Sequence, residues 1–316
     1  MATNPYKAFV PCLVTRCLPS GELEDYAATD PTAGDWRRVG LCEPMKGEGF
    51  IVDLQGAGKL MAVQFNERIL PGKVRDEQLA KEVAKVEKAN GRKIGKKEYA
   101  QLREQVEFDL LPRAFIRRTV VPILFTKIDA DRNLMLVCTS SAKRADDCVA
   151  VLLGAYPDLL PTVLSVDTVD VSSRLRTLAI DGFLQDEDNE RESGFFSHDS
   201  IVLKGDEKKA IRIKDKPVGD ADVQALLNDT KYTVVEMGVG YSANPHDEGF
   251  TLTFTVNEAI IFKRIVTEGV KASMIKEDLY AYTVMCVGLY RQMLVRFIAA
   301  FGGLASTAST DEDDDL

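Results

Sequence analysis

The chain has 316 residues, of which 45% are hydrophobic and 28% are charged, and its formal net charge is −9. This composition is typical of a soluble globular protein with two or three domains, and no apolar run approaches the roughly 20 residues that a bilayer-spanning helix needs. A net negative charge taken alone argues against a nucleic-acid partner, so the placement of the charges matters more than their sum.

The N-terminal part of the chain and the segment after residue 114 are predicted to share one sheet. Period-two patterns and turn signals predict five strands and one helix. The strands are expected at 9–15, 49–52, 60–65, 115–128 and 134–139. Pro122 marks a bulge or an edge position in the long fourth strand. Ser140 or Ser141 is expected to cap a helix that runs to Leu153.

Residues 70–114 are predicted to form a charged helical hairpin between two of these strands. Leu79, Val83 and Val86 recur at spacings of four and three, which predicts a first helix over 74–89 with one narrow apolar stripe. Asn90-Gly91 ends it, because glycine suits a left-handed helix cap. A second helix is expected over 96–111, with Tyr99, Leu102, Val106 and Leu110 on its buried face and Pro112 at its end.

The hairpin carries the only positive block of the chain. Over 73–104 ten bases face six acids, and the turn from Lys88 to Lys97 has five bases and no acid. One interpretation is a solvated hairpin laced with helix salt bridges. The other is a surface that meets an anionic partner, in particular through Arg92, Lys93, Lys96 and Lys97 at the turn.

The C-terminal half is predicted to be a second α+β unit. A connecting strand is expected over 159–171, and the acidic, turn-rich stretch 184–200 is expected to be a loop. Strands are predicted at 201–204, 210–213, 233–240, 250–256 and 259–265, with a helix from Asp220 to Leu227. A long helix over 276–301 has a broad apolar face, buried either in its own domain or at a subunit interface. The acidic end of the chain is expected to be disordered.

Side chains suited to catalysis are sparse. The two histidines, His198 and His246, are predicted to lie in polar loops, and the six cysteines are scattered, which favours reduced thiols in a cytoplasmic protein. Pro157-Asp158 followed by Glu207-Lys208-Lys209 has a superficial likeness to the Pro-Asp…Glu-x-Lys pattern of metal-dependent nucleases. The long gap between the two parts weakens that interpretation, and we expect no cofactor and no metal.

Several segments together resemble the RdgC family of bacterial recombination-associated DNA-binding proteins. They are Ile69-Leu70-Pro71, the mixed-charge hairpin, the hexapeptide Leu110-Leu111-Pro112-Arg113-Ala114-Phe115 and the stretch Ser141-Ala-Lys-Arg-Ala-Asp-Asp147. The likeness is clearest over 68–161, fainter over 1–67 and weak but collinear over 170–300. Within 1–67, Gly40–Met45 fits a Gly-x-x-Pro-Pro-Met-like segment with Glu43 in place of the first proline.

The resemblance implies an α+β fold with a horseshoe-shaped subunit that pairs into a ring-shaped dimer. The implied regions are a centre (1–69 and 115–168), a helical-hairpin finger (70–114), a base (169–302) and an acidic tail (303–316). The implied function is non-catalytic, sequence-nonspecific binding of duplex DNA that restrains RecA-type recombination at the nucleoid in the cytoplasm. The alternative is a metal-dependent DNA nuclease that takes part in recombination.

The resemblance also implies residue roles. A basic residue at the finger turn and the arginine and phenylalanine of the hexapeptide carry DNA binding and ring closure, and the matching positions are Arg92, Arg113 and Phe115. From the residues alone, Phe115 is equally well a core aromatic. Of Arg117 and Arg118, which point to opposite faces of a strand, at most one joins the surface of Arg113, and we select Arg117.

A second basic cluster falls in the base. It contains Lys208, Lys209, Arg212, Lys214 and Lys216. The ring-lining lysine of the family aligns with Asp215 or, after a slip of one residue, with Lys216, so the chain departs from the family at the first of these positions. From this cluster we select Lys214 and Lys216 as candidate DNA contacts. The expected partners are therefore duplex DNA and a second copy of the chain, in competition with RecA and without a membrane.

Overall fold

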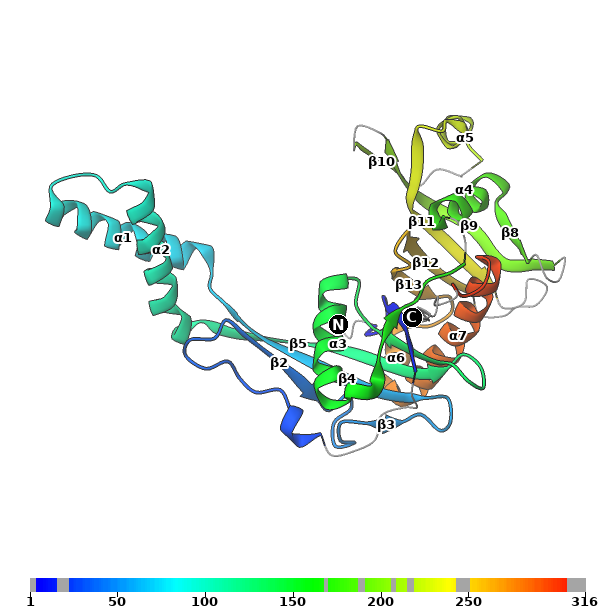
Figure 1. Ribbon diagram of the computed structural model, residues 1–316, viewed down its shortest axis with the longest axis horizontal. Coiled ribbons are helices and arrows are strands. Elements are labelled where there is room, and N and C mark those ends of the chain that lie inside the picture. The colour runs from blue at the N-terminus through cyan, green and yellow to red at the C-terminus, as the bar shows by residue number, and fades with distance from the viewer. Residues whose placement is uncertain are drawn as a thin grey trace, which may run out of the picture. The chain divides into compact units, whose positions relative to one another are not determined.

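The computed structural model describes residues 4–15, 23–167, 170–186, 191–205, 209–214, 219–242 and 251–305. The chain forms two compact units: unit 1 comprises 1–19, 52–60 and 122–316, and unit 2 comprises 20–51 and 61–121. Both sheets and helices are present, so the expected α+β class is confirmed (Figure 1). The division into centre, finger, base and tail stays a prediction.

A seven-stranded sheet has the order β2-β4-β5-β6-β1-β7, with β3 beside β4. Its strands are β1 (Val10–Val14), β2 (Arg37–Cys42), β3 (Val52–Asp53), β4 (Lys59–Ile69), β5 (Phe115–Lys127), β6 (Asn133–Val137) and β7 (Thr162–Val163). The hairpin β5–β6 and the pairing of strands around Gly56–Gly58 are confirmed, but the strand expected over 49–52 is reduced to Val52–Asp53, and β2 was not predicted. Pro122 lies just before the stretch of β5 that pairs with β6, as suits a residue without an N–H.

A six-stranded antiparallel sheet in unit 1 has the order β10-β9-β11-β12-β13, with β8 beside β9. Its strands are β8 (Phe183–Asp186), β9 (Arg191–Gly205), β10 (Ala210–Lys214), β11 (Tyr232–Ser242), β12 (Thr251–Asn257) and β13 (Phe262–Thr267). The meander β11–β13 is confirmed. The loop expected over 184–200 is wrong, because β8 and β9 pair there, and residues 187–190 lie outside the described part.

Seven α-helices and three short 3₁₀ turns are described in these ranges. They are α1 (Gly72–Asn90), α2 (Lys96–Leu110), α3 (Ala142–Ala155), α4 (Val171–Asp181), α5 (Ala221–Asn228), α6 (Ala272–Glu277), α7 (Leu279–Ala300), η1 (Glu24–Tyr26), η2 (Leu111–Arg113) and η3 (Pro157–Leu159). Ser141 and Asp220 cap α3 and α5 as expected. The strand expected over 159–171 is reduced to β7, and α4, capped by Asp170, was not predicted.

The core of unit 1 lies between α7 and the six-stranded sheet. Phe297 stacks on Phe301 at 4.0 Å and meets Phe262 edge-on at 5.3 Å, while Phe9 lies 4.8 Å from Phe262. The apolar face of α7 is therefore buried within its own chain. The predicted long helix is interrupted, because the Asp278 side chain accepts a hydrogen bond from Ala281 N and starts α7 afresh.

The described cysteines agree with the expectation of reduced thiols. Four of them, Cys12, Cys138, Cys148 and Cys286, are buried and unpaired, and Cys42 is half-buried. The expectation that no apolar run approaches membrane-spanning length is wrong for α7, which has the length and composition of a membrane span, with a mean hydropathy of 1.2 over its most apolar 18 residues. Half of the most apolar 18-residue stretch of α7 is buried inside the protein, as in the core helix of a folded domain.

Candidate nucleic-acid interface

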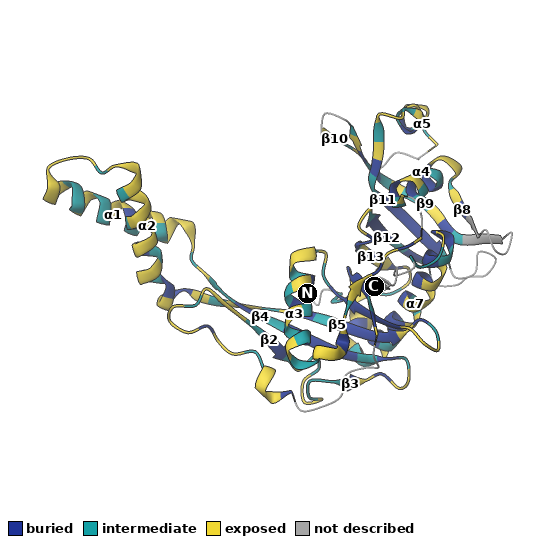
Figure 2. Ribbon diagram, viewed as in Figure 1, coloured by how far each residue is buried: buried dark blue, intermediate teal, exposed yellow. Residues whose placement is uncertain are grey.

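The helical hairpin α1–α2 belongs to unit 2 and buries very little of its surface. Leu79 in α1 and Val106 in α2 are its only buried residues, each 3% exposed, and they lie on the predicted stripes. Tyr99 is 46% exposed, so its predicted place in the seam is wrong. Figure 2 shows the resulting pattern, in which most of both helices is exposed. The hairpin therefore presents nearly all of its charged side chains to solvent.

Local contacts fix the turn between the two helices. Gly91 ends α1 with φ of 64°, a left-handed conformation that glycine adopts without strain. At the start of α2, the Glu98 carboxylate accepts a hydrogen bond from Gly95 N at 2.9 Å, and Glu87 accepts one from Ile94 N at 3.2 Å. These bonds satisfy backbone donors that the helix ends leave open.

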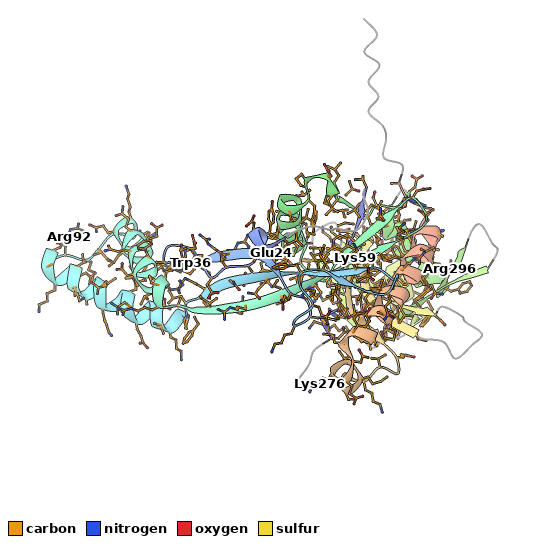
Figure 3. The ribbon with its side chains drawn as sticks, turned by 90° about the horizontal axis from the view of Figure 1, so that it is seen from below. Glu24, Trp36, Lys59, Arg92, Lys276 and Arg296 are labelled. Atoms are coloured by element: carbon orange, nitrogen blue, oxygen red, sulfur yellow. The ribbon has the colours of Figure 1, made fainter. Side chains whose placement is uncertain are left out.

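All three arginines of the hairpin are held by acids. Arg92 binds Glu98 through both terminal nitrogens, at 2.9 and 2.6 Å, while Arg75 and Arg103 lie 3.5 and 3.1 Å from Glu107. The hydrogen bond from Arg92, with a smaller contribution from that of Gly95 N, lowers the pKa of Glu98 to about 2. Arg92, at the hairpin turn in Figure 3, is thus a fixed cation whose side chain remains 59% exposed.

The lysines of the hairpin behave differently. Lys85 pairs with Glu82 at 2.6 Å, but the other six lysines are exposed and have no ion pair with any acid in the described ranges. These six are Lys73, Lys81, Lys88, Lys93, Lys96 and Lys97, and we call them the unpaired hairpin lysines. Their ammonium groups remain available to an anionic partner.

The hexapeptide lies where α2 joins β5, and a half-buried arginine holds it. Arg68 of β4 donates hydrogen bonds to Leu111 O at 2.8 Å and to Pro31 O at 3.0 Å. Within the hexapeptide, Leu111 and Ala114 are buried, whereas Arg113 is exposed and has no ion pair in the part of the chain that the structure describes. Phe115 is 78% exposed, so it is not a core aromatic of this chain.

Other large apolar side chains are exposed near the ends of the hairpin that join the strands, and at Trp36. Phe108 in the last turns of α2 is 64% exposed, and Trp36 and Val74 are both 47% exposed. Figure 3 places Trp36 beside the strands that lead into the hairpin. Together with Phe115 we call these residues the hairpin-base apolar set; each is at least 47% exposed.

The predicted contribution of Arg117 meets an observed competitor. Arg117 donates to the Glu67 carboxylate at 2.8 Å, and Arg118 pairs with Asp30 at 2.8 Å on the opposite face of β5. Both side chains are still about half exposed. Arg117 is therefore a neutralised cation in this structure, unlike Arg113.

The second basic cluster is divided by the limits of the described residues. Lys214 ends β10 in unit 1 and is exposed, beside Arg212 two residues earlier. Lys208 and Lys216 lie outside the described ranges, as does Glu207 of the nuclease-like pattern. Asp158, the other carboxylate of that pattern, lies in η3. Among described residues, no three His, Cys, Asp or Glu side chains lie close enough together to hold a metal ion.

Sequence reasoning selected Lys93, Lys96 and Lys97 as DNA contacts. It counted Lys73, Lys81 and Lys88 among the exposed bases without selecting them, and it did not single out Arg68. A weak signal existed for the lysines, since pairing each base with an acid three or four positions away leaves a surplus of lysines. No local signal existed for Arg68, because its partners Pro31 and Leu111 lie 37 and 43 residues away in sequence.

Comparison with known proteins gives a consistent result. A family model described as "Putative exonuclease, RdgC" matches residues 18–304. Recombination-associated protein RdgC of Haemophilus influenzae is 26% identical over 294 residues, which cover 89% of this chain and 90% of that protein. The proteins of the same name from Aeromonas hydrophila and Proteus mirabilis are 36% and 34% identical over 166 and 140 residues. Those alignments cover 51% and 43% of this chain, and 52% and 45% of the relatives.

Proposed function

Because the chain belongs to the RdgC family of recombination-associated proteins, we propose that it binds duplex DNA without catalysis and without sequence preference, as a ring-shaped homodimer. In this proposal the protein occupies DNA at the nucleoid in the cytoplasm and thereby restrains a RecA-type recombinase. The observation that carries the proposal is the set of unpaired hairpin lysines on an otherwise acidic chain.

The charge distribution supports contact with phosphates rather than with bases. Lysine is a flexible point charge, and a lysine that neutralises a phosphate releases a counterion whatever the base sequence. The acidic remainder of the chain repels DNA, so the basic hairpin focuses the attraction on one element. Lys93, Lys96 and Lys97 supply the proposed contacts at the turn, and Arg113 supplies one at the hexapeptide.

Arg92 has a different part in this proposal. Its guanidinium is aligned by Glu98, which fixes the turn that carries the three lysines and leaves one exposed edge of the cation for DNA. Arg117 can contribute only when DNA competes with Glu67. Lys214 and Lys216 remain proposed contacts of the base region.

The hairpin-base apolar set supports the dimer. Phe115 is 78% exposed. Complete burial of a phenylalanine side chain by a partner would stabilise the complex by roughly 1.5–3 kcal/mol. A second copy of the chain is the partner that the ring model requires. The mass of the protein in solution tests this part directly, and a monomer at all concentrations would contradict it.

A metal-dependent nuclease is the second candidate, because the matching family model carries the word exonuclease in its description. Incubation of the protein with end-labelled linear duplex and Mg²⁺ separates the two candidates. We expect a retarded band of intact DNA. In a separate assay, the protein should compete with a RecA recombinase for DNA and slow strand exchange. Degradation of the labelled DNA that requires Mg²⁺ and increases with protein concentration would instead establish the nuclease.

A further inference from the structure

The six-stranded sheet carries a pocket that the hairpin does not explain. It lies in unit 1, has a volume of about 340 Å³, and takes its lining from β9, β10, β11, β12 and β13. That volume is within the range of small-ligand sites, roughly 300–1,000 Å³. We call it the two-bulge pocket, because interruptions of the strand ladder in β9 and in β13 both open into it.

The first bulge lies in β9. The register passes from Met237 opposite Ile201 to Val239 opposite Ser197, so the single residue Gly238 of β11 faces three residues of β9. Those three, His198, Asp199 and Ser200, all line the pocket. Gly238 forms its floor, where a Cβ atom would come within 2.7 Å of the Ser200 hydroxyl. Only glycine therefore leaves the space open without displacing Ser200.

The second bulge turns a basic side chain out of the core. Phe262 and Ile265 of β13 are both buried although they are three residues apart, which strict alternation forbids. The ladder shifts by one residue here, and Arg264 takes a φ of 53°, so that both Lys263 and Arg264 point away from the core. Bulges commonly re-aim side chains in this way beside functional sites, and a left-handed backbone is costly for arginine.

The charges of the pocket favour an anion. Lys214 and Arg264 line it, and Lys214 has no ion pair with a described acid. Glu236 already binds Lys263 at 2.8 Å and lies 3.9 Å from Arg264, which leaves guanidinium donors available. Asp199 is the acid of the lining, and its carboxylate contacts Nδ1 of His198. Ser200 and Thr253 add hydroxyls to the lining and Phe254 adds an apolar ring, whereas the Thr255 hydroxyl already donates to Lys263 O at 3.3 Å.

We propose that the two-bulge pocket binds a phosphate group, through Arg264 and Lys214 with help from His198 and the hydroxyls. An arginine fork and a lysine ammonium match the oxygens of a phosphate, and hydroxyls donate to those that remain. The phosphate belongs either to a nucleic-acid backbone or to a small phosphorylated molecule. The site is separate from the unpaired hairpin lysines and shares only Lys214 with the proposed DNA contacts of the base region, so phosphate binding through Arg264 can hold even if the proposed function fails.

Titration of the full chain with inorganic phosphate, at pH 7 and constant ionic strength, tests the proposal. The chain has two histidines, so the His198→Gln variant identifies the imidazole signal of His198 by NMR. We expect a saturable shift of that signal with phosphate and none with chloride. The Lys214→Ala and Arg264→Gly variants should each weaken phosphate binding by roughly tenfold, as for a hydrogen bond to a charged group.

Two comparisons make this test specific. Arg264→Gly suits the left-handed backbone, so its melting temperature should not fall, and loss of binding then reflects loss of the guanidinium. Lys204→Ala removes an exposed charge of β9 that does not line the pocket, and it should leave phosphate affinity unchanged. The absence of a saturable shift, or an equal loss in Lys204→Ala, would overturn the proposal.

The source of the phosphate follows from the same variants. If the site takes a phosphate of duplex DNA, Lys214→Ala should reduce the slope of log K against log salt by about 0.9. If it takes a small molecule, that slope stays at the parental value while inorganic phosphate binding is lost. Variants of the hairpin lysines should retain the phosphate-induced shift of His198 in both cases.

Discussion

The α1–α2 hairpin and the α7 helix show two opposite uses of a helix in one chain. In α7, ten residues are buried, and aromatic contacts fix the helix against the six-stranded sheet. In the hairpin, each helix buries one residue and holds its shape with ion pairs and helix caps. Helix α7 stabilises unit 1 through its buried face, whereas the two helices of the hairpin leave most of their surface exposed to solvent.

The two elements also differ in what stabilises them. Apolar contacts fix α7 with little dependence on salt or pH, because burial of apolar area involves no charge and is the dominant favourable contribution to folding. The hairpin has little such area, so its stability depends on local bonds that salt and pH can weaken. The region proposed to meet DNA is therefore also the region with the lower local stability.

The largest effect is expected in the core of α7. Phe297→Ala removes contacts with Phe195, Phe262 and Phe301 and should lower the free energy of unfolding of unit 1 by about 3–5 kcal/mol. Denaturant unfolding measures this change. Val295→Ala, at a position 40% exposed on the same helix, is the control and should change little. Equal small effects for both variants would contradict the assignment of α7 as a core helix.

A smaller and more local effect is expected in the hairpin seam. Leu79→Ala should cost about 2 kcal/mol, at the low end for a leucine, because the thin seam can relax around the lost volume. Amide hydrogen exchange should increase in 72–110 and stay unchanged in α7. An increase spread evenly over both units would show that the hairpin is not an independent element of stability.

The turn should respond to acid. The pKa of Glu98 is lowered from 4.5 to about 2, so its stabilising bonds are complete above about pH 4.5 and are lost as the pH falls towards 2. At pH 6 the amides of 91–99 should exchange faster in Glu98→Gln than in the parent protein. The two proteins should converge near pH 2, and a difference that persists there would contradict a role for the ionised carboxylate.

The smallest effect on folding is expected for Phe115. Because its side chain is 78% exposed, Phe115→Ala should change the stability of the isolated subunit by less than about 0.5 kcal/mol. Self-association, measured by analytical ultracentrifugation, should weaken if Phe115 lies in the dimer contact. A large loss of stability with unchanged self-association would contradict this prediction and indicate that Phe115 is a core residue.

The sequence predicted the parts of the fold that depend on local signals. The helices of the hairpin follow from the stripe through Leu79 and from Gly91 and Pro112, and the cap of α5 follows from Asp220. Strand β8 and the part of β9 before residue 201 were missed, because this stretch is acidic and turn-rich and shows no clear alternation of apolar and polar residues; β9 is specified by pairing with the distant β11. A signal for α4 was present in Leu175, Leu178 and Ala179, at spacings of three and four.

The candidate site divides in the same manner. Composition located the basic turn, and the family resemblance singled out Arg92, Arg113 and Phe115. The structure adds which charges are already used: Arg92 by Glu98, six residues away, and Arg117 by Glu67, fifty residues away. The first pairing is foreseeable from a glycine cap followed by an acid, whereas the second depends on the pairing of distant strands.

The central claim is that the unpaired hairpin lysines contact DNA phosphates. The most direct measurement is the salt dependence of duplex affinity for the parent and for a variant with Lys93→Ala, Lys96→Ala and Lys97→Ala together. A control variant removes the same charge from unit 1 through Lys231→Ala, Lys271→Ala and Lys276→Ala, all exposed. The hairpin variant should lose affinity, and its slope of log K against log salt should fall by up to about 2.7, at roughly 0.9 per contact, with the control near the parent. Parental affinity and slope in the hairpin variant would contradict the claim.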